Sequence, residues 1–299
     1  MSISDGPVDG AASFGADAIL RQSRYENFPV ASFVLPRRWR DHLLAIYGFA
    51  RLADDIGDEA KGDRLALLDW LETELDRAAT GQATHPLLRR LTPTITDLHL
   101  SLDPFRALIE ANRVDQTVTR YETFDDLIGY CQLSAVPVGR LVLAVFGADT
   151  PDRMALSDDV CAGLQVVEHL QDIAEDAERG RVYLPQHDLR AMGVDERDLR
   201  ATRATPALRR LIAVQANRAR RLLTSGTPLA RSLSWPARVA VAGFTGGGMA
   251  ALDAIGKARY DVLGHRCRPL PTRLGVHTAT SLLGHSATSV PSTSIDAVA

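Results

Sequence analysis

Two groups of acidic residues lie far apart in this 299-residue chain, each inside a stretch whose apolar spacing predicts a helix. Asp54, Asp55 and Asp58 form the first acidic motif, in RLADDIGDE, and Asp172 and Asp176 form the second, in EHLQDIAED. Carboxylates gathered in this way repel one another unless a cation joins them. Oxygen ligands alone favour Mg²⁺ or Mn²⁺ over zinc. The two motifs therefore predict a divalent metal site.

The first motif belongs to a polar stripe on its predicted helix. Tyr47, Arg51, Asp54 and Asp58 follow one another at i, i+4, i+7 and i+11. Residues three or four positions apart share one face of an α-helix, so these side chains are expected on the same face.

A matching stripe accompanies the second motif. Gln165, Glu168, Asp172 and Asp176 occur at i, i+3, i+7 and i+11. If the two helices face each other, the stripes would line a single acidic cavity.

The elements that must position these residues are helices. Apolar residues recur at i, i+3, i+4 and i+7 along the chain, and neither a strand pattern nor an internal repeat is found. The predicted helices span residues 38–56, 63–79, 85–112, 122–147, 154–178, 205–225 and 234–264. We expect one all-α domain over residues 16–274, a flexible N-terminus over 1–15 and a flexible Ser- and Thr-rich tail over 275–299.

Composition narrows the function classes. A net charge of −3 argues against a nucleic-acid surface, which needs a clear basic excess. Three cysteines without a CxxC pair indicate neither a disulfide framework nor a zinc knuckle, and fit a cytoplasmic protein. The N-terminus does not have the pattern of a signal peptide, and no uninterrupted apolar stretch reaches the ~18 residues of a membrane-spanning helix.

The arrangement of carboxylates and cations suits diphosphate chemistry. Mg²⁺ ions held by two acidic helices would neutralise a diphosphate and make it a better leaving group, while apolar walls hold the resulting carbocation. Arg51 precedes the first motif, and Arg179 and Arg181 follow the second, where guanidinium groups could receive phosphate oxygens. Three tyrosines could orient phosphate or shield a cation with their rings: Tyr47, Tyr130 and Tyr183.

Longer segments around these residues resemble signatures of the squalene and phytoene synthase family. They are ENFPVASFVLPRRWRDHLLAIYGFARLADDIGDE, LIEANRVDQTVTRYETFDDLIGYCQLSAVPVGRLVLAVFG and LQVVEHLQDIAEDAERGRVYLP, and they cover roughly residues 20–190. ARYDVLGHRCRP at 258–269 is similar to the family's C-terminal helix. The ENFPV opening, the YCQLSAVPVGR segment and Gln171 before Asp172 resemble the bacterial hydroxysqualene synthase branch of the hopanoid route.

The resemblance implies a single-domain isoprenoid synthase fold, with helices around a central cavity that binds a prenyl diphosphate through Mg²⁺ or Mn²⁺. In this branch, presqualene diphosphate loses its diphosphate, its cyclopropane rearranges and water captures the cation. By motif position, the implied catalytic residues are Tyr47, Arg51, Tyr130, Gln165 and Tyr183. The implied substrate contacts are Phe28, Arg51, Tyr130, Gln165 and Arg181. The implied metal ligands are Asp54, Asp55, Asp58, Glu168, Asp172 and Asp176.

The second motif departs from the family's pattern. Glu168 stands where the family normally has asparagine, and its carboxylate could complete a more anionic metal triad or bind the metal too tightly. His169 lies beside the metal face, where a satisfied interior histidine is the ordinary interpretation. Val136 replaces a residue that is commonly polar in this branch.

Three functions remain open on the sequence. The first is a lyase acting on presqualene diphosphate, the second a transferase that joins two prenyl diphosphates head to head, and the third a non-catalytic binding or assembly protein. Both acidic motifs argue against the third, while Glu168 keeps it open. Because substrate and product are lipophilic, peripheral contact with the inner face of the membrane is compatible with each enzyme function.

Overall fold

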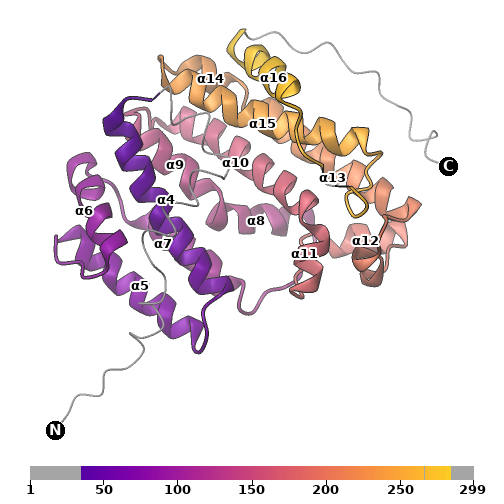
Figure 1. Cartoon of the computed structure of the whole chain (residues 1–299), viewed down its shortest axis with the longest axis horizontal. Coiled ribbons are helices and arrows are strands. Elements are labelled where there is room, and N and C mark those ends of the chain that lie inside the picture. The colour runs from indigo at the N-terminus through magenta and orange to yellow at the C-terminus, as the bar shows by residue number, and fades with distance from the viewer. Residues whose placement is uncertain (1–34, 266, 284–299) are drawn as a thin grey trace. The chain divides into compact units, whose positions relative to one another are not determined.

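The computed structural model describes residues 35–265 and 267–283, and every regular element within them is a helix (Figure 1). Apart from the helices, the described backbone forms one isolated parallel bridge, between Arg120 and Val182. The predicted all-α class is therefore confirmed. The chain divides into two compact units: the chain up to Val118 with Gln132–Asp149, and Thr119–Cys131 with the chain from Thr150 onward.

The first unit is built around α4, which packs against four other helices of this unit. The buried ring of Phe49 on α4 meets that of Phe105 on α7 edge to face, with centroids 5.1 Å apart. Helix α5 begins at Asp63, whose side chain accepts a hydrogen bond from the Ala66 backbone N–H. The helices of this unit are α4 (Arg37–Asp58), α5 (Arg64–Ala79), α6 (Pro86–Leu98), α7 (Asp103–Val114) and α9 (Val136–Val145).

The second unit is built around α10, which packs against α13, α14 and α15. Close packing needs Gly163 on α10, since a Cβ there would lie 2.9 Å from Leu223 Cγ on α13. Helices α15 and α16 lie side by side (Figure 1). The elements are α10 (Pro151–Gln171), α11 (Ile173–Glu178), α12 (Gln186–Met192), the 3₁₀ helix η1 (Glu196–Arg200), α13 (Pro206–Ser225), α14 (Pro228–Ser232), α15 (Ala237–Lys257) and α16 (Pro271–Leu283); α8 (Phe124–Ser134) begins in this unit.

Three of the predicted helices are interrupted. The helix expected over 85–112 ends at His99, which adopts a left-handed conformation with φ 50°, and a new helix starts beyond it. The helix expected over 122–147 is divided at Ala135, because Pro137 in the first turn of α9 has no backbone N–H with which to continue the preceding helix. The helix expected over 154–178 changes direction at Asp172, whose φ of −104° and ψ of 13° separate α10 from α11.

The C-terminal end of the structure can be compared with the predicted limit between domain and tail. The tail was expected from residue 275, but residues up to Leu283 continue α16, because that helix packs on α15. The close approach requires Gly246, where a Cβ would lie 2.7 Å from the Thr278 backbone nitrogen. Residues 1–15 and 284–299 lie outside the described residues, and one domain over 16–274 stays a prediction.

Two segments, Phe124–Val145 and Ala237–Lys257, are long and apolar enough by length and composition to cross a membrane. Half or more of each is buried inside the protein, as in the core helices of soluble proteins.

Candidate active site

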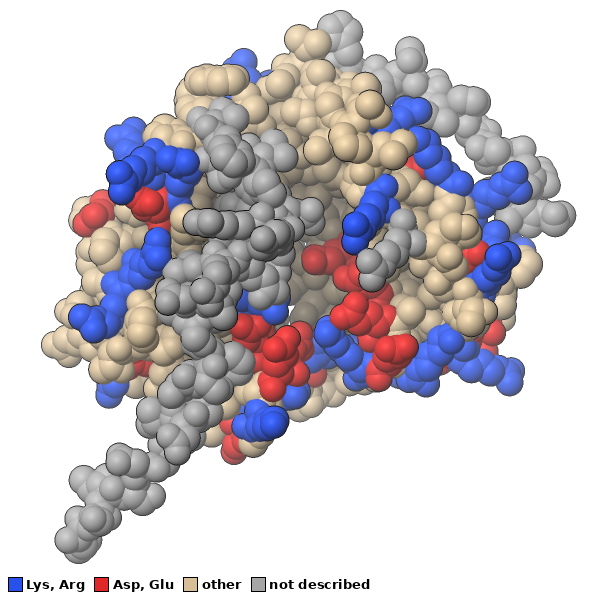
Figure 2. All heavy atoms as spheres, viewed as in Figure 1, with Lys and Arg blue, Asp and Glu red and all other residues tan. Residues whose placement is uncertain are grey.

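Acidic side chains on the face that Figure 2 draws lie close to Lys and Arg side chains. Ion pairing therefore decides which carboxylates remain available to a ligand. In the first unit, Asp55 is buried and forms an ion pair with Arg51 one turn earlier on α4, with 2.7 Å between Nε and Oδ1. Arg51, which was expected to receive phosphate, is thus partly engaged by its own helix. Asp54 is exposed and Asp58 half-buried.

Helix α7 and the turn after it supply two amide side chains that the sequence motifs did not include. Asn112 Nδ2 donates to Asp54 Oδ1 at 3.1 Å, and Gln116 Nε2 donates to the Gly57 carbonyl oxygen at 3.1 Å. Gly57 makes this approach feasible, since a Cβ there would lie 2.1 Å from Asn112 Oδ1. Two amides four residues apart in NRVDQ were the signal that could have revealed this contact.

The second acidic motif has fewer partners of its own. Asp176 Oδ2 is buried and accepts no hydrogen bond within the described part of the chain. Burial, and then the charge of Asp172, raise the pKa of Asp176 to about 7 against the opposing effect of Arg181 and Arg179. Although Asp172 itself is exposed, desolvation of its carboxyl and the charge of Glu175 raise its pKa as well.

An aromatic cluster adjoins this motif within the second unit. The rings of His169 and Tyr183 stack with centroids 3.8 Å apart and an interplanar angle of 14°. The ring centroid of Tyr130 lies 5.6 Å from that of Tyr183, and the ring centroid of Tyr121 lies 5.3 Å from that of Tyr130. Burial lowers the pKa of His169 to about 3, so its imidazole is neutral. Such rings can lie against a carbocation and stabilise it.

Backbone pairing between two segments brings the tyrosines together. Val182 N–H donates to the Thr119 carbonyl oxygen, and Gln186 N–H donates to that of Tyr121, each at 2.9 Å. The guanidinium of Arg120 adds hydrogen bonds to both carboxylate oxygens of Glu196, at 2.6 and 2.7 Å. Tyr121 and Tyr183 therefore come from strand-like segments that are held in register.

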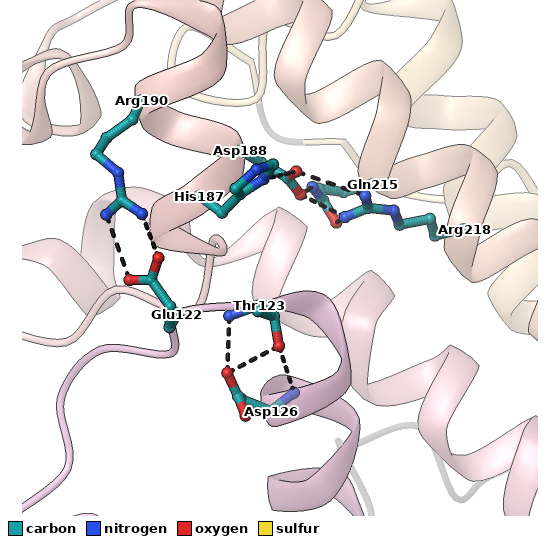
Figure 3. Close-up of polar contacts among 8 residues, drawn as sticks. All are labelled: Glu122, Thr123, Asp126, His187, Asp188, Arg190, Gln215 and Arg218. Atoms are coloured by element: carbon teal, nitrogen blue, oxygen red, sulfur yellow. Dashed lines mark hydrogen bonds and ion pairs between the residues drawn. The ribbon is translucent and has the colours of Figure 1, made fainter.

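A polar network fixes the helices that flank this pairing (Figure 3). Asp188, at the start of α12, accepts hydrogen bonds from Gln215 and Arg218 of α13. Burial opposes its ionisation, yet these hydrogen bonds hold the pKa of Asp188 below its usual value. The Arg218 guanidinium also lies 4.8 Å from the centre of the Phe124 ring, which starts α8. Helix α8 carries Tyr130, so the network helps to place that ring.

Two more contacts in Figure 3 reinforce the same region. Arg190 of α12 pairs with Glu122, directly after Tyr121. Asp126 accepts hydrogen bonds from the backbone and hydroxyl of Thr123, both at 2.8 Å, and so stabilises the first turn of α8.

The predicted site residues thus fall into two groups. In the second unit, Tyr130, Gln165, Tyr183 and Asp176 surround His169, and Gln165 Nε2 lies 3.2 Å from His169 Nε2. Two further predicted residues lie nearby in the chain: Glu168, which is exposed on α10, and Arg181, which follows α11.

In the first unit, Tyr47, Arg51 and the first acidic motif all lie on α4. Phe28 lies outside the described residues. Among those that are described, His, Cys, Asp and Glu form no group of three or more that could hold a metal ion by itself.

Residues 21–273 match the squalene/phytoene synthase family. The chain belongs to this family. It is 43% identical over 215 residues to hydroxysqualene synthase from Rhodopseudomonas palustris, covering 70% of this chain and 72% of that protein. Hydroxysqualene synthase from Sinorhizobium fredii is 40% identical over 212 residues, covering 69% and 70%.

A solved structure extends the likeness. The squalene synthase HpnC from Alicyclobacillus acidocaldarius superposes with a TM-score of 0.77 at 43% identity, covering 88% of this chain and 98% of that one. A dehydrosqualene synthase in complex with a ligand shares the fold with a TM-score of 0.79 at 23% identity. The predicted family and isoprenoid synthase fold are confirmed, and the chain is a squalene/phytoene synthase-like enzyme.

Proposed function

We propose that this enzyme is a hydroxysqualene synthase, which releases diphosphate from presqualene diphosphate and lets water capture the rearranged carbocation. The observation that carries the proposal is the buried, neutral aromatic cluster beside the second acidic motif. The motif offers carboxylates to a metal–diphosphate, while the rings of Tyr130, His169 and Tyr183 offer a surface for the cation. Relatives at 43% and 40% identity that bear this name support the choice of substrate.

Mg²⁺ fits the donors of the second motif. Asp176 presents a buried oxygen without a hydrogen bond among the described residues, and the pKa values of Asp172 and Asp176 are raised in the absence of a cation. All-oxygen donors favour a hard cation such as Mg²⁺, with Mn²⁺ as the alternative. We propose that Asp172 and Asp176, with Glu168 beside them, hold Mg²⁺, and that Asp54, Asp55 and Asp58 of the first motif are Mg²⁺ ligands as well. The bound cation would neutralise the departing diphosphate.

The remaining roles belong to side chains of the protein. Arg179 and Arg181 follow the second motif and lower the pKa of Asp176, so their positive charge acts at the carboxylates. We propose that Arg181 also contacts diphosphate oxygens. Tyr130 and Tyr183 are both buried, and so they would exclude bulk water from the cation.

A paired substrate assay tests the function. Purified protein with Mg²⁺ is offered presqualene diphosphate and farnesyl diphosphate in parallel, and products are identified by mass spectrometry. Hydroxysqualene formed from presqualene diphosphate alone is the expected result. Conversion of farnesyl diphosphate to presqualene diphosphate would contradict the proposal. Absence of diphosphate release from either substrate would favour a non-catalytic binding or assembly protein.

The second candidate function is head-to-head condensation of two prenyl diphosphates. A longer likeness favours it, since the phytoene synthase of Arthrospira platensis is 30% identical over 260 residues, covering 81% of this chain and 83% of that protein. Because this identity is lower than the 43% shared with a hydroxysqualene synthase, condensation is the second candidate function.

We also propose that the cytoplasmic enzyme contacts the membrane peripherally through its C-terminal third. Residues 201–299 contain 13 Lys or Arg but only three Asp and no Glu, so this part attracts anionic lipid. Trp235 and Leu283 are each 71% exposed, and Val276 is 55% exposed. Aromatic and aliphatic side chains of this kind insert at the lipid interface.

Sedimentation with vesicles tests this contact. Binding to phosphatidylglycerol vesicles that falls in Trp235→Ala, but not in Leu65→Ala, is expected; Leu65 is an exposed leucine of the first unit. Equal binding by both variants would contradict the assigned surface.

A further inference from the structure

His169 occupies the centre of the candidate site, although neither acidic motif accounts for a histidine there. Its side chain is 11% exposed, and it contacts residues from three parts of the second unit. Tyr183 stacks on the ring face, Gln165 lies at Nε2, and Asp176 Oδ2 lies 3.9 Å from Nδ1.

The chemistry of the amide fixes the direction of the hydrogen bond. Gln165 Nε2 can only donate, so His169 Nε2 must accept across the 3.2 Å that separates them. A ring nitrogen that accepts a hydrogen bond carries no proton, so the single proton of the imidazole resides on Nδ1, which faces Asp176. The other tautomer would set two N–H groups against each other.

This hydrogen bond also sets the orientation of the Gln165 side chain. With Nε2 engaged by His169, the carbonyl oxygen Oε1 becomes the end of the amide that can serve a ligand, because the described residues supply no hydrogen bond to it. Stacking on Tyr183 holds the plane of the imidazole, and the hydrogen bond to Gln165 selects which ring nitrogen faces the amide.

We propose that His169 is a positioning residue, and that it fixes Gln165 so that Oε1 accepts a hydrogen bond from the water that captures the carbocation. The water oxygen forms the new C–O bond, and its released proton passes to the diphosphate that has already departed. Gln165 orients the water without taking a proton, since an amide is not a base at neutral pH. This inference rests on the proposed function, which supplies the cation.

His169→Phe tests the proposal directly. Phenylalanine keeps an aromatic ring for Tyr183 but lacks the acceptor for Gln165. We expect the share of alcohol among the products to fall about five-fold, as for the loss of one hydrogen bond, with hydrocarbon products rising. The share of alcohol should fall by a larger factor than the rate of diphosphate release, because phenylalanine keeps an aromatic surface for the cation and only water capture uses this bond. His187→Phe, at an exposed histidine of the same unit, is the matched control.

A double-mutant cycle separates positioning from a purely structural role. Gln165→Leu removes the carbonyl oxygen and should shift the products in the same direction as His169→Phe. Because both changes act on one water, the double variant should shift them no further than Gln165→Leu alone. Additive shifts, or an unchanged alcohol share in His169→Phe, would overturn the proposal.

Nitrogen NMR of the histidine rings provides a test that does not depend on turnover. The wild-type spectrum should show His169, assigned by its loss in His169→Phe, with the proton on Nδ1. Gln165→Leu should abolish this preference. A proton on Nε2 in the wild type would overturn the positioning role, whereas failure of the substrate assay alone would overturn only the proposed function.

Discussion

The two acidic motifs carry similar residues, but their carboxylates differ in burial and in hydrogen-bond partners. In the first unit, Arg51 pairs with Asp55 and Asn112 donates to Asp54, so the carboxylates are stabilised by their own neighbours. In the second unit, Asp176 has a buried oxygen that no described residue satisfies, and burial raises its pKa to about 7. This difference predicts that a bound cation would stabilise the second motif more than the first.

The largest expected effect is on turnover. Asp172→Ala should reduce kcat by ~10³-fold or more, because it removes a proposed ligand of the cation that would stabilise the leaving group. Asp54→Ala should also abolish most activity. Steady-state kinetics would measure both, and circular dichroism should show unchanged helical content.

Controls for these variants are available on nearby helices. Asp125→Ala, at an exposed position of α8, and Asp41→Ala, at a position of α4 whose side chain is 60% exposed, should retain activity. Wild-type rates in both Asp54→Ala and Asp172→Ala would refute the metal role of the motifs.

The next effect is on stability as a function of pH. The pKa of Asp176 is raised to about 7 from the usual 3.8, so the folded protein binds this proton more tightly than the unfolded chain does. The contribution of this proton to the free energy of unfolding is therefore fully present below about pH 4 and is lost as the pH rises through about 7. Without metal, Asp176→Asn should be more stable than the wild type at pH 8 by a few kcal/mol, since one pKa unit corresponds to ~1.4 kcal/mol.

Urea unfolding in a metal chelator at pH 4 and pH 8 would measure this difference. The two proteins should have similar stability at pH 4, where the wild-type carboxyl is protonated. A parallel pH dependence in both proteins would show that Asp176 is not the responsible group.

A smaller stability effect belongs to the first motif. Gly57→Ala would place a Cβ 2.1 Å from Asn112 Oδ1, so the Asn112 side chain must move from the position in which it donates to Asp54. We expect a loss of about 1–3 kcal/mol in the free energy of unfolding, as for other overpacked sites. Gly129→Ala on α8, where no atom of the described residues outside the local helix backbone lies within 4 Å of the added Cβ, should be neutral or slightly stabilising. Equal effects of the two changes on the urea midpoint would contradict the packing assigned to Gly57.

The smallest effect is expected at Glu168. Its side chain is exposed, so Glu168→Asn, which introduces the residue that the resemblance implies at this position, removes a charge without opening a cavity. The Mg²⁺ concentration that gives half-maximal activity should rise by a few-fold, with little change in kcat at saturating Mg²⁺. A large loss of kcat would instead assign Glu168 a direct role in turnover.

The sequence predicted the helices well because their apolar spacing is regular, and the family signatures led to the fold. It did not reveal the breaks at His99, Ala135 and Asp172, since each lies inside a continuous apolar pattern and depends on local backbone conformation.

For the candidate site, residue spacing selected the acidic residues but could not show their unequal environments. Burial and hydrogen bonding depend on segments distant in sequence, as Asn112 on Asp54 and Tyr183 on His169 illustrate.

Proton release on metal binding tests the contrast between the motifs most directly. At pH 7, Asp176 should be about half protonated, so Mg²⁺ must displace that proton when it binds. A weakly buffered solution with a pH-sensitive dye should report release of about half a proton per protein on addition of Mg²⁺ to the wild type. Asp55→Asn should preserve this release, and Asp176→Asn should abolish it. No release from the wild type, or equal release from Asp176→Asn, would contradict a second motif that depends on an external cation.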